Sequence, residues 1–149
     1  MKKTAVRVLI VFMFFFSSCS SPSDTDGEIP PDTSPPRSGE WSAVNTGFGG
    51  FDFTINAGSS YITSITYKFS DWRCGSGSLI SGNITISTDP GWPITNNTFQ
   101  IQRTLDPGGQ QQLTIRGTFN DTGDSVSGEW EGNVSGTNCI GIWSGSPKN

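Results

Sequence analysis

The stretch Leu113–Val134, LTIRGTFNDTGDSVSGEWEGNV, decides the fold class. Apolar or glycine residues alternate with polar residues on both sides of a central NDTGDS, the pattern of two half-buried strands joined by a turn. Reflecting the sequence about that turn pairs Phe119 with Val126 and Ile115 with Trp130. Because a slip of one residue would turn these large side chains to solvent, this pairing defines the register of a β-hairpin.

The same period-two alternation recurs on either side of the hairpin, and no segment shows a helical period. We therefore predict an all-β domain of about eight antiparallel strands. The predicted architecture is a jelly-roll-like β-sandwich, and a closed up-and-down β-barrel is the alternative. Further alternating or short apolar runs lie at Trp41, 51–55, 61–69, 80–86, 99–102 and 140–142.

The N-terminus has the pattern of an export signal. Lys2, Lys3 and Arg7 precede the apolar run Val8–Phe16, and two small serines follow that run. The run is shorter than the roughly 20 residues that a membrane-spanning helix needs. Residues 1–18 are therefore predicted to be a secretory signal peptide, which is absent from the mature fold.

Cys19, the residue after the predicted signal peptide, is one of three cysteines in the chain. Phe16-Ser17-Ser18-Cys19 resembles a bacterial lipobox, which implies that Cys19 carries a diacylglyceryl group and that the protein is a bacterial lipoprotein. Two or more acyl chains on one residue would give stable membrane anchoring. The alternative is ordinary cleavage nearby, which would leave Cys19 as a free thiol.

Residues 19–38 are predicted to form a disordered tether. They contain five of the nine prolines, and most of the others are Ser, Thr, Asp, Gly or Glu, a composition that buries no core. Ser20 and the acidic residues behind it resemble the sorting signals of outer-membrane and surface-exposed lipoproteins. We therefore expect a lipoprotein of the cell envelope, in the outer membrane, with a single domain at residues 39–149.

Charge and composition narrow the set of partners. From Cys19 onward the chain has six basic and thirteen acidic residues, a net charge of −7, which argues against nucleic acid as a partner. The chain has no histidine, which is the commonest metal ligand and general base. We expect no metal and no cofactor, and we expect a monomer that contacts the membrane through its lipid.

Cys74 and Cys139 are the only cysteines in the predicted domain. Paired cysteines persist in the oxidising environment that an exported chain meets, so a disulfide between them is predicted. Closing that loop would stabilise the fold by about 4 kcal/mol on the chain-entropy model. Two buried thiols are the alternative.

Several short motifs are spread along residues 39–149. Together they resemble a small all-β domain recurrent in bacterial secreted proteins and lipoproteins. The resemblance implies the fold and the disulfide, and it implies no catalytic chemistry. The motifs are Gly39/Trp41, Cys74-Gly75, Asn96/Phe99, Ile115/Gly117/Phe119, Gly128/Trp130 and Cys139/Trp143-Ser144.

Two tryptophans are candidate ligand-binding groups. Trp92 lies in STDPGWPITNN together with Asp89 and Asn96, and Trp72 lies in FSDWRCG. A tryptophan on a rigid loop can stack on a sugar or an aromatic ligand, and the neighbouring polar side chains can hydrogen-bond to hydroxyl groups. The alternative is that both rings fold back over the ends of the domain.

The sequence shows no motif of a known enzyme class, so we predict that the protein is not an enzyme. Glu129 and Glu131 flank Trp130 on one strand face, and a glycosidase using this pair is a minor alternative. The predicted function is a non-catalytic binding module with a glycan or a protein as ligand. An inhibitor of a cell-wall hydrolase is a further possibility. A small-ligand carrier is another, because Gly39-Glu40-Trp41 resembles the opening of lipocalins.

Overall fold

Eight β-strands fill most of the part of the chain that the computed structural model describes, residues 33–75 and 80–149. No helix in these two ranges is long and apolar enough to cross a membrane. In chain order the strands are β1 (Gly39–Asn45), β2 (Phe51–Ile55), β3 (Tyr61–Trp72), β4 (Ile80–Pro93), β5 (Thr98–Thr104), β6 (Gln111–Phe119), β7 (Val126–Val134) and β8 (Thr137–Pro147).

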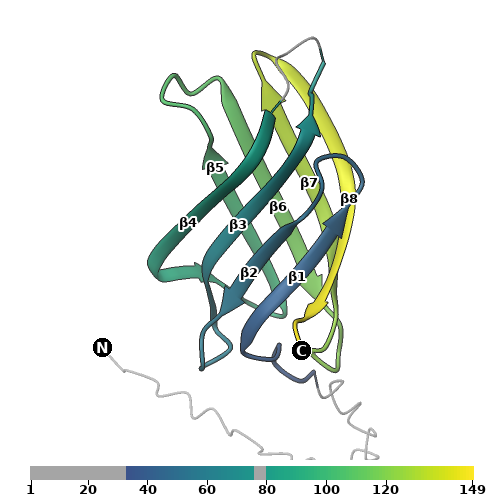
Figure 1. Ribbon diagram of the computed structural model, residues 1–149. Coiled ribbons are helices and arrows are strands. Elements are labelled where there is room, and N and C mark those ends of the chain that lie inside the picture. The colour runs from purple at the N-terminus through teal and green to yellow at the C-terminus, as the bar shows by residue number, and fades with distance from the viewer. Residues whose placement is uncertain (1–32, 76–79) are drawn as a thin grey trace, which may run out of the picture. The chain divides into compact units, whose positions relative to one another are not determined.

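The strands form one antiparallel sheet in the order β4-β3-β2-β1-β8-β7-β6-β5. The ladder between β1 and β8 joins the first strand to the last, and the sheet curls into a barrel (Figure 1). Within the described residues no ladder joins β4 to β5. The barrel wall is therefore incomplete along these two strands, and we call this line the β4–β5 seam.

The all-β class and the antiparallel strands are confirmed, and the architecture is an up-and-down barrel in place of the jelly-roll sandwich. In a jelly roll, long connections cross between two sheets. Here every strand is paired with a strand adjacent to it in the chain, except at the β1–β8 closure, and all eight strands belong to one sheet.

The β6–β7 hairpin has the predicted register. Phe119 lies opposite Val126 and Ile115 lies opposite Trp130 in the ladder. The turn is held by Asn120, whose side-chain oxygen accepts hydrogen bonds from the backbone N–H groups of Asp124 and Ser125, at 3.0 and 3.1 Å. These hydrogen bonds between the Asn120 side chain and the backbone explain why β6 ends and a turn begins at the NDTGDS stretch.

Aromatic rings fill the barrel. Trp41 stacks on Phe53 with ring centroids 5.7 Å apart, and Phe51 meets Trp143 edge to face at 4.9 Å. Such offset and edge contacts are favourable geometries for aromatic pairs. The buried aromatic residues are Trp41, Phe48, Phe51, Phe53, Tyr67, Phe69, Trp72, Phe99, Phe119, Trp130 and Trp143.

Glycines in the wall make room for these rings. A Cβ atom at Gly117 in β6 would lie 2.6 Å from the ring of Phe99 and 2.7 Å from the ring of Trp143. The single glycine among the large inward-facing residues of this strand is therefore a packing requirement of the interior.

One end of the barrel is closed by the loop between β1 and β2. Phe48 in this loop is fully buried, and its ring packs 5.2 Å from that of Phe69 and 5.3 Å from that of Trp130. A hydrogen bond of 2.9 Å from the Phe48 N–H to the Asn45 side-chain oxygen fixes the turn. The loop thus inserts a plug into the interior.

The predicted disulfide is present: Cys74, just after β3, is bonded to Cys139 in β8. β3 and β8 are separated in the sheet by β2 and β1. The bond therefore links strands that share no backbone ladder. The alternative of two buried thiols does not hold.

The other end is covered by residues 33–38, which we call the N-terminal clip. The Ser34 N–H donates to the carbonyl of Asp121 at 2.8 Å, and the Arg37 N–H donates to the carbonyl of Gly123 at 2.9 Å. Pro36 in the middle of the clip is fully buried. The clip is therefore part of the folded unit.

This placement corrects the predicted domain boundary. The backbone hydrogen bonds of Ser34 and Arg37 and the burial of Pro36 show that the folded part begins before residue 39. The sequence pattern missed the clip because its proline-rich composition is the same as that of a free tether. The rest of the predicted tether, residues 19–32, and the predicted signal peptide lie outside the described residues.

Candidate functional site

The β4–β5 seam is the place where the core is incompletely covered. Among the described residues, the half-buried hydrophobic side chains packed against the core lie on β4, in the turn after it or directly after β5, with the exception of Cys139. Along the seam they are Ile80, Ile84, Ile86, Trp92, Ile94 and Leu105. Apolar surface is thus accessible along one line of a barrel whose interior is otherwise packed.

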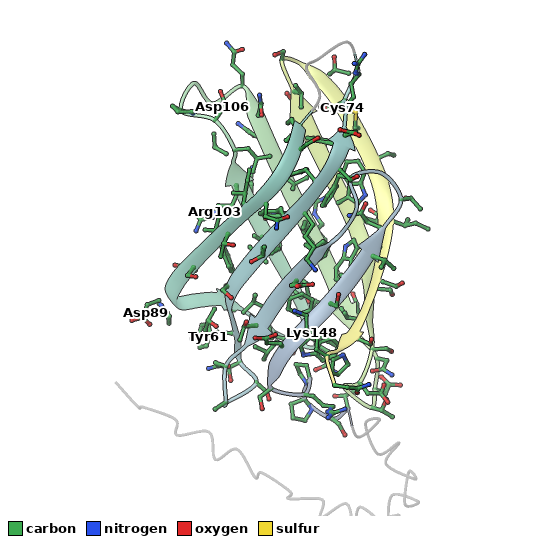
Figure 2. The ribbon with its side chains drawn as sticks, viewed as in Figure 1. Tyr61, Cys74, Asp89, Arg103, Asp106 and Lys148 are labelled. Carbon is green, nitrogen blue, oxygen red and sulfur yellow. A yellow bond between two sulfur atoms is a disulfide. The ribbon has the colours of Figure 1, made fainter. Side chains whose placement is uncertain are left out.

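Trp92 and Arg103 face each other across this seam. β4 bends after Ser87, where the pairing with β3 shifts, and the bend places Trp92 opposite Ile62. Arg103 continues the inward-facing series of Phe99 and Ile101 in β5, and its guanidinium carbon lies 5.0 Å from the centroid of the Trp92 ring. Figure 2 shows Arg103 beside β4 and β5. This cation–π contact joins two strands that lack a ladder.

Two buried hydrogen-bond donors, one in β3 and one in β5, have no acceptor among the described residues. They are the hydroxyl of Tyr67, a fully buried residue of β3, and the Nε–H of Arg103. Burial raises the pKa of the Tyr67 hydroxyl well above its ordinary value, and the positive charge of Arg103 works against this rise. The Tyr67 hydroxyl therefore stays protonated and available as a donor at neutral pH.

The predicted binding residues are placed as follows. Trp92 is in β4, half-buried, and Asp89 is exposed at the bend of the same strand (Figure 2). Asn96 is exposed in the turn before β5 and has a φ of 50°. No hydrogen bond among the described residues links Asp89 or Asn96 to Trp92. The expected cluster is therefore reduced to Trp92, with Arg103 as its neighbour.

The structure corrects the prediction that Trp72 is a ligand-binding group. It is 3% exposed and packs in the interior, with its ring centroid 6.0 Å from that of Trp130 and 5.5 Å from that of Phe69. It lies at the end of β3 and not on an exposed loop, because the strand runs on into the closed end of the barrel. Its ring is thus a core group with no free face for a sugar.

Tyr67 and Arg103 are site residues that sequence reasoning missed. The alternation places Tyr67 on an apolar strand face and says nothing more of it. Arg103 carried a usable signal, because a charged residue in the inward phase of a strand, after Phe99 and Ile101, is unusual. The unpaired hydroxyl of Tyr67 depends on packing and has no signal in the sequence.

Glu129 and Glu131 lie on the outer wall of the barrel. Glu131 pairs with Arg116 of the neighbouring strand at 3.6 Å, and Arg116 also donates from Nε to the side chain of Gln100 at 3.3 Å. Both groups of the ion pair are more than 40% exposed. The Glu131 carboxylate is thus engaged in an exposed ion pair on an open face of the sheet.

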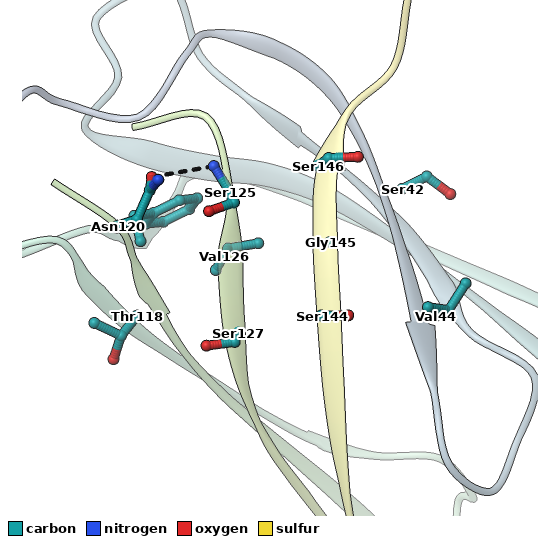
Figure 3. A pocket seen from close by; sticks show the side chains of 11 residues that line it. Ser42, Val44, Thr118, Asn120, Ser125, Val126, Ser127, Ser144, Gly145 and Ser146 are labelled. Atoms are coloured by element: carbon teal, nitrogen blue, oxygen red, sulfur yellow. Dashed lines mark hydrogen bonds between the residues drawn. The ribbon is translucent and has the colours of Figure 1, made fainter. Parts of the chain in front are cut away.

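A wider hollow lies on the outer wall where β1, β8, β7 and β6 run side by side. Its volume is about 720 Å³, and Figure 3 shows its short, mostly hydroxyl-bearing side chains. Val44 at its edge is 67% exposed and Ile142 nearby is 65% exposed. The hollow is lined by Ser42, Val44, Thr118, Phe119, Asn120, Ser125, Val126, Ser127, Ser144, Gly145 and Ser146.

Charged groups gather on the outer wall around β2. The carboxylate of Asp52 accepts hydrogen bonds from Lys148 and Lys68, each at 2.7 Å, and from Ser42 at 3.0 Å. Burial works to raise the pKa of Asp52, but these hydrogen bonds outweigh it and hold the pKa below its ordinary value. The bond to Asp52 raises the pKa of Lys148 in turn. This cluster fastens the C-terminal end to β2.

Nothing in the described ranges brings together three His, Cys, Asp or Glu side chains that could hold a metal ion. In the β6–β7 turn, hydrogen bonds from Asn120 and Thr122 lower the pKa of Asp124 and occupy its carboxylate. These contacts account for Asp124 as a residue that holds the turn. Cys19, the predicted lipidation site, lies outside the described residues.

Comparison with known proteins does not assign the chain to a family. No family model, no curated protein and no solved structure matches it. The resemblance to lipoproteins and to a recurrent all-β domain stays a prediction.

Proposed function

We propose that this chain is a membrane-anchored lipoprotein of the bacterial cell envelope whose barrel is a non-catalytic binding module, and that its ligand binds at the β4–β5 seam. The observation that carries the proposal is the contact of Arg103 with Trp92 in a line of half-buried apolar side chains. Apolar surface with a few convergent polar groups is the usual character of a ligand site.

The packed interior favours the seam over the barrel axis. Phe48 plugs one end, and the N-terminal clip with Pro36 covers the other. A ligand taken into the centre, as in a lipocalin-like carrier, would have to displace aromatic side chains. A ligand laid along the seam would mainly cover apolar surface that is already accessible.

A panel of ligands tests this proposal. Soluble oligosaccharides, the neutral amphiphile octyl glucoside and short carboxylates are added to the isotope-labelled full chain, and amide and indole shifts are recorded. We expect at least one class to shift the indole of Trp92 and amides of β4 and β5. The proposal is wrong if every panel member leaves the seam unchanged, or if the shifts fall elsewhere on the barrel.

The anchor is tested separately. The lipobox resemblance predicts that Cys19 incorporates an alkyne-labelled fatty acid in bacterial cells and that the protein partitions with outer membranes. Cys19→Ala should lose both the label and the membrane association. A Cys19→Ala protein that still carries label, or a wild-type protein that never does, would contradict the proposed anchoring.

A second candidate function is binding to a protein, such as inhibition of a cell-wall hydrolase. It is favoured by the exposed Val44, Ile140 and Ile142 of β1 and β8, because adjacent exposed apolar side chains mark interaction surfaces. The measurement is lysozyme turnover with added full chain. The double variant Ile140→Ser and Ile142→Ser should relieve any inhibition, whereas Arg103→Met should not.

A further inference from the structure

On the basis of the proposed binding at the seam, we propose that its ligand is a single-chain amphiphile with a carboxylate head, of the fatty-acid class. Arg103 and the Tyr67 hydroxyl hold the carboxylate. The hydrocarbon chain lies along Ile84 and Ile86 of β4. Three unsatisfied features of the structure support this assignment.

The first feature is the pair of donors. The Tyr67 hydroxyl and the Arg103 Nε–H are buried and have no acceptor in the described part of the chain. A buried donor without a partner costs free energy, and few such groups occur in folded proteins. An ionised carboxylate is acceptor-only, and its two oxygens match two donors that lack an acceptor. The two side chains lack a hydrogen-bond acceptor, so the proposed ligand has an acceptor-only head group.

The second feature is charge. Every ion pair found among the described residues uses other basic groups, namely Lys68, Arg116 and Lys148. Arg103 instead places its guanidinium over Trp92, which fixes the group without neutralising it. A half-buried cation without a carboxylate partner favours an anionic ligand. A neutral sugar would leave this charge unpaired.

The third feature is apolar. Ile84 and Ile86 face the interior, yet they remain half-buried because, within the described residues, no strand is paired with β4 on that side. Ile80 and Leu105 extend the same accessible line towards one end of the seam. A hydrocarbon chain would remove this surface from water, at about 0.8 kcal/mol for each buried CH₂.

A single water molecule is the simplest rival occupant. Water could accept from the Tyr67 hydroxyl or from Arg103, but it brings no charge and covers no isoleucine. A free small anion would neutralise the charge of Arg103 but would leave the apolar surface of Ile84 and Ile86 exposed to water. The amphipathic carboxylate is the occupant that meets all three features.

The test is calorimetric titration of the full chain with dodecanoate, with acetate and octyl glucoside as the head-only and neutral comparisons. We expect dodecanoate to bind and acetate to show no measurable binding. Arg103→Met should weaken dodecanoate binding by at least about tenfold, since a hydrogen bond to a charged group is lost. Arg116→Met, which removes an outer-wall arginine, should leave the affinity unchanged.

Tyr67→Phe supplies a variant that keeps the fold. It removes a hydroxyl without a partner, so the unliganded protein should be as stable as the wild type or slightly more stable. Dodecanoate should nevertheless bind several-fold more weakly, while Tyr61→Phe should bind as the wild type does. If water is the true occupant, Tyr67→Phe destabilises the unliganded protein and leaves binding unchanged, which overturns the proposal.

The outcomes separate this inference from the proposed function. If octyl glucoside or an oligosaccharide shifts the Trp92 indole and dodecanoate does not, the seam is a binding site and the carboxylate assignment is wrong. If dodecanoate binds equally well to Arg103→Met, the assignment is also wrong. If no compound binds the seam, both proposals fail.

Discussion

The guanidinium carbon of Arg103 lies 5.0 Å from the centroid of the Trp92 ring, and this contact spans the line where the described part of the barrel lacks a backbone ladder. A side-chain pair here substitutes for the hydrogen bonds that join the other neighbouring strands. The seam therefore holds both the half-buried apolar side chains of the core and Arg103, a charged residue on the inward-facing side of its strand.

Replacing Trp92 by leucine should destabilise the protein by about 1–2 kcal/mol, because the cation–π contact and part of the ring's buried area are lost. Urea unfolding at neutral pH measures the change. Trp92→Phe keeps an aromatic face for Arg103 and should lose less. Equal stability of wild type and Trp92→Leu would show that the contact adds nothing to the seam.

Replacing both Cys74 and Cys139 by alanine should lower the free energy of unfolding by about 4 kcal/mol, because the denatured chain regains the freedom of a long loop. Denaturant unfolding with and without reductant measures this effect. Reductant should weaken the wild type and leave the double variant unchanged. A wild type insensitive to full reduction would contradict the expectation.

Asp52 and Lys148 should give stability a weak pH dependence at both extremes. The pKa of Asp52 is lowered by folding, so its contribution is complete above its unfolded value of about 3.9 and is lost as the pH falls through the folded value. The pKa of Lys148 is raised by folding, so its contribution is complete below about 10.4 and is lost as the pH rises through the folded value.

Asp52→Asn should therefore be less stable than the wild type by less than about 1 kcal/mol across the middle of the pH range, since the lysines of the cluster are substantially exposed. The two stability curves should converge at acid pH. Asp121→Asn, in the β6–β7 turn, serves as the control for a simple change of net charge. A constant difference down to the lowest pH would exclude the ion cluster as its cause.

Gly117→Ala should destabilise the barrel by about 1–3 kcal/mol, because the new methyl group would overlap the rings of Phe99 and Trp143. Gly58→Ala is the matched control, since its Cβ would meet other atoms at ordinary contact distance, 3.7 Å or more. Thermal unfolding of the two variants compares them directly. An equal stability change in both variants would show that overlap with the rings of Phe99 and Trp143 does not set the cost.

Pro36→Ala should cost about 1 kcal/mol, because buried ring carbons are removed from the clip. Pro35→Ala changes the freedom of the unfolded chain in the same way but removes an exposed ring. The difference between the two variants therefore isolates the burial of Pro36. Identical unfolding curves would show that the clip is not held by this residue.

The hairpin around Asn120 was predictable because a local turn and a strict alternation fix its register together. The choice between sandwich and barrel was not, because both place the same residues inside. Trp72 was misplaced for a related reason: its burial depends on the Phe48 plug and on Trp130, which lie far from it in sequence. The donors of Tyr67 and Arg103 were missed because an unmet hydrogen bond is a property of the assembled interior.

The N-terminal clip also decides how the barrel would bear a mechanical load. Tension applied through the preceding residues reaches the clip first, where backbone bonds to Asp121 and Gly123 share it with the β6–β7 turn. Beyond the clip it passes into β1, which is laddered to β2 on one side and to β8 on the other. A pull along β1 therefore strains two ladders in shear at once, so a barrel tethered at this end would resist being unravelled from its point of attachment.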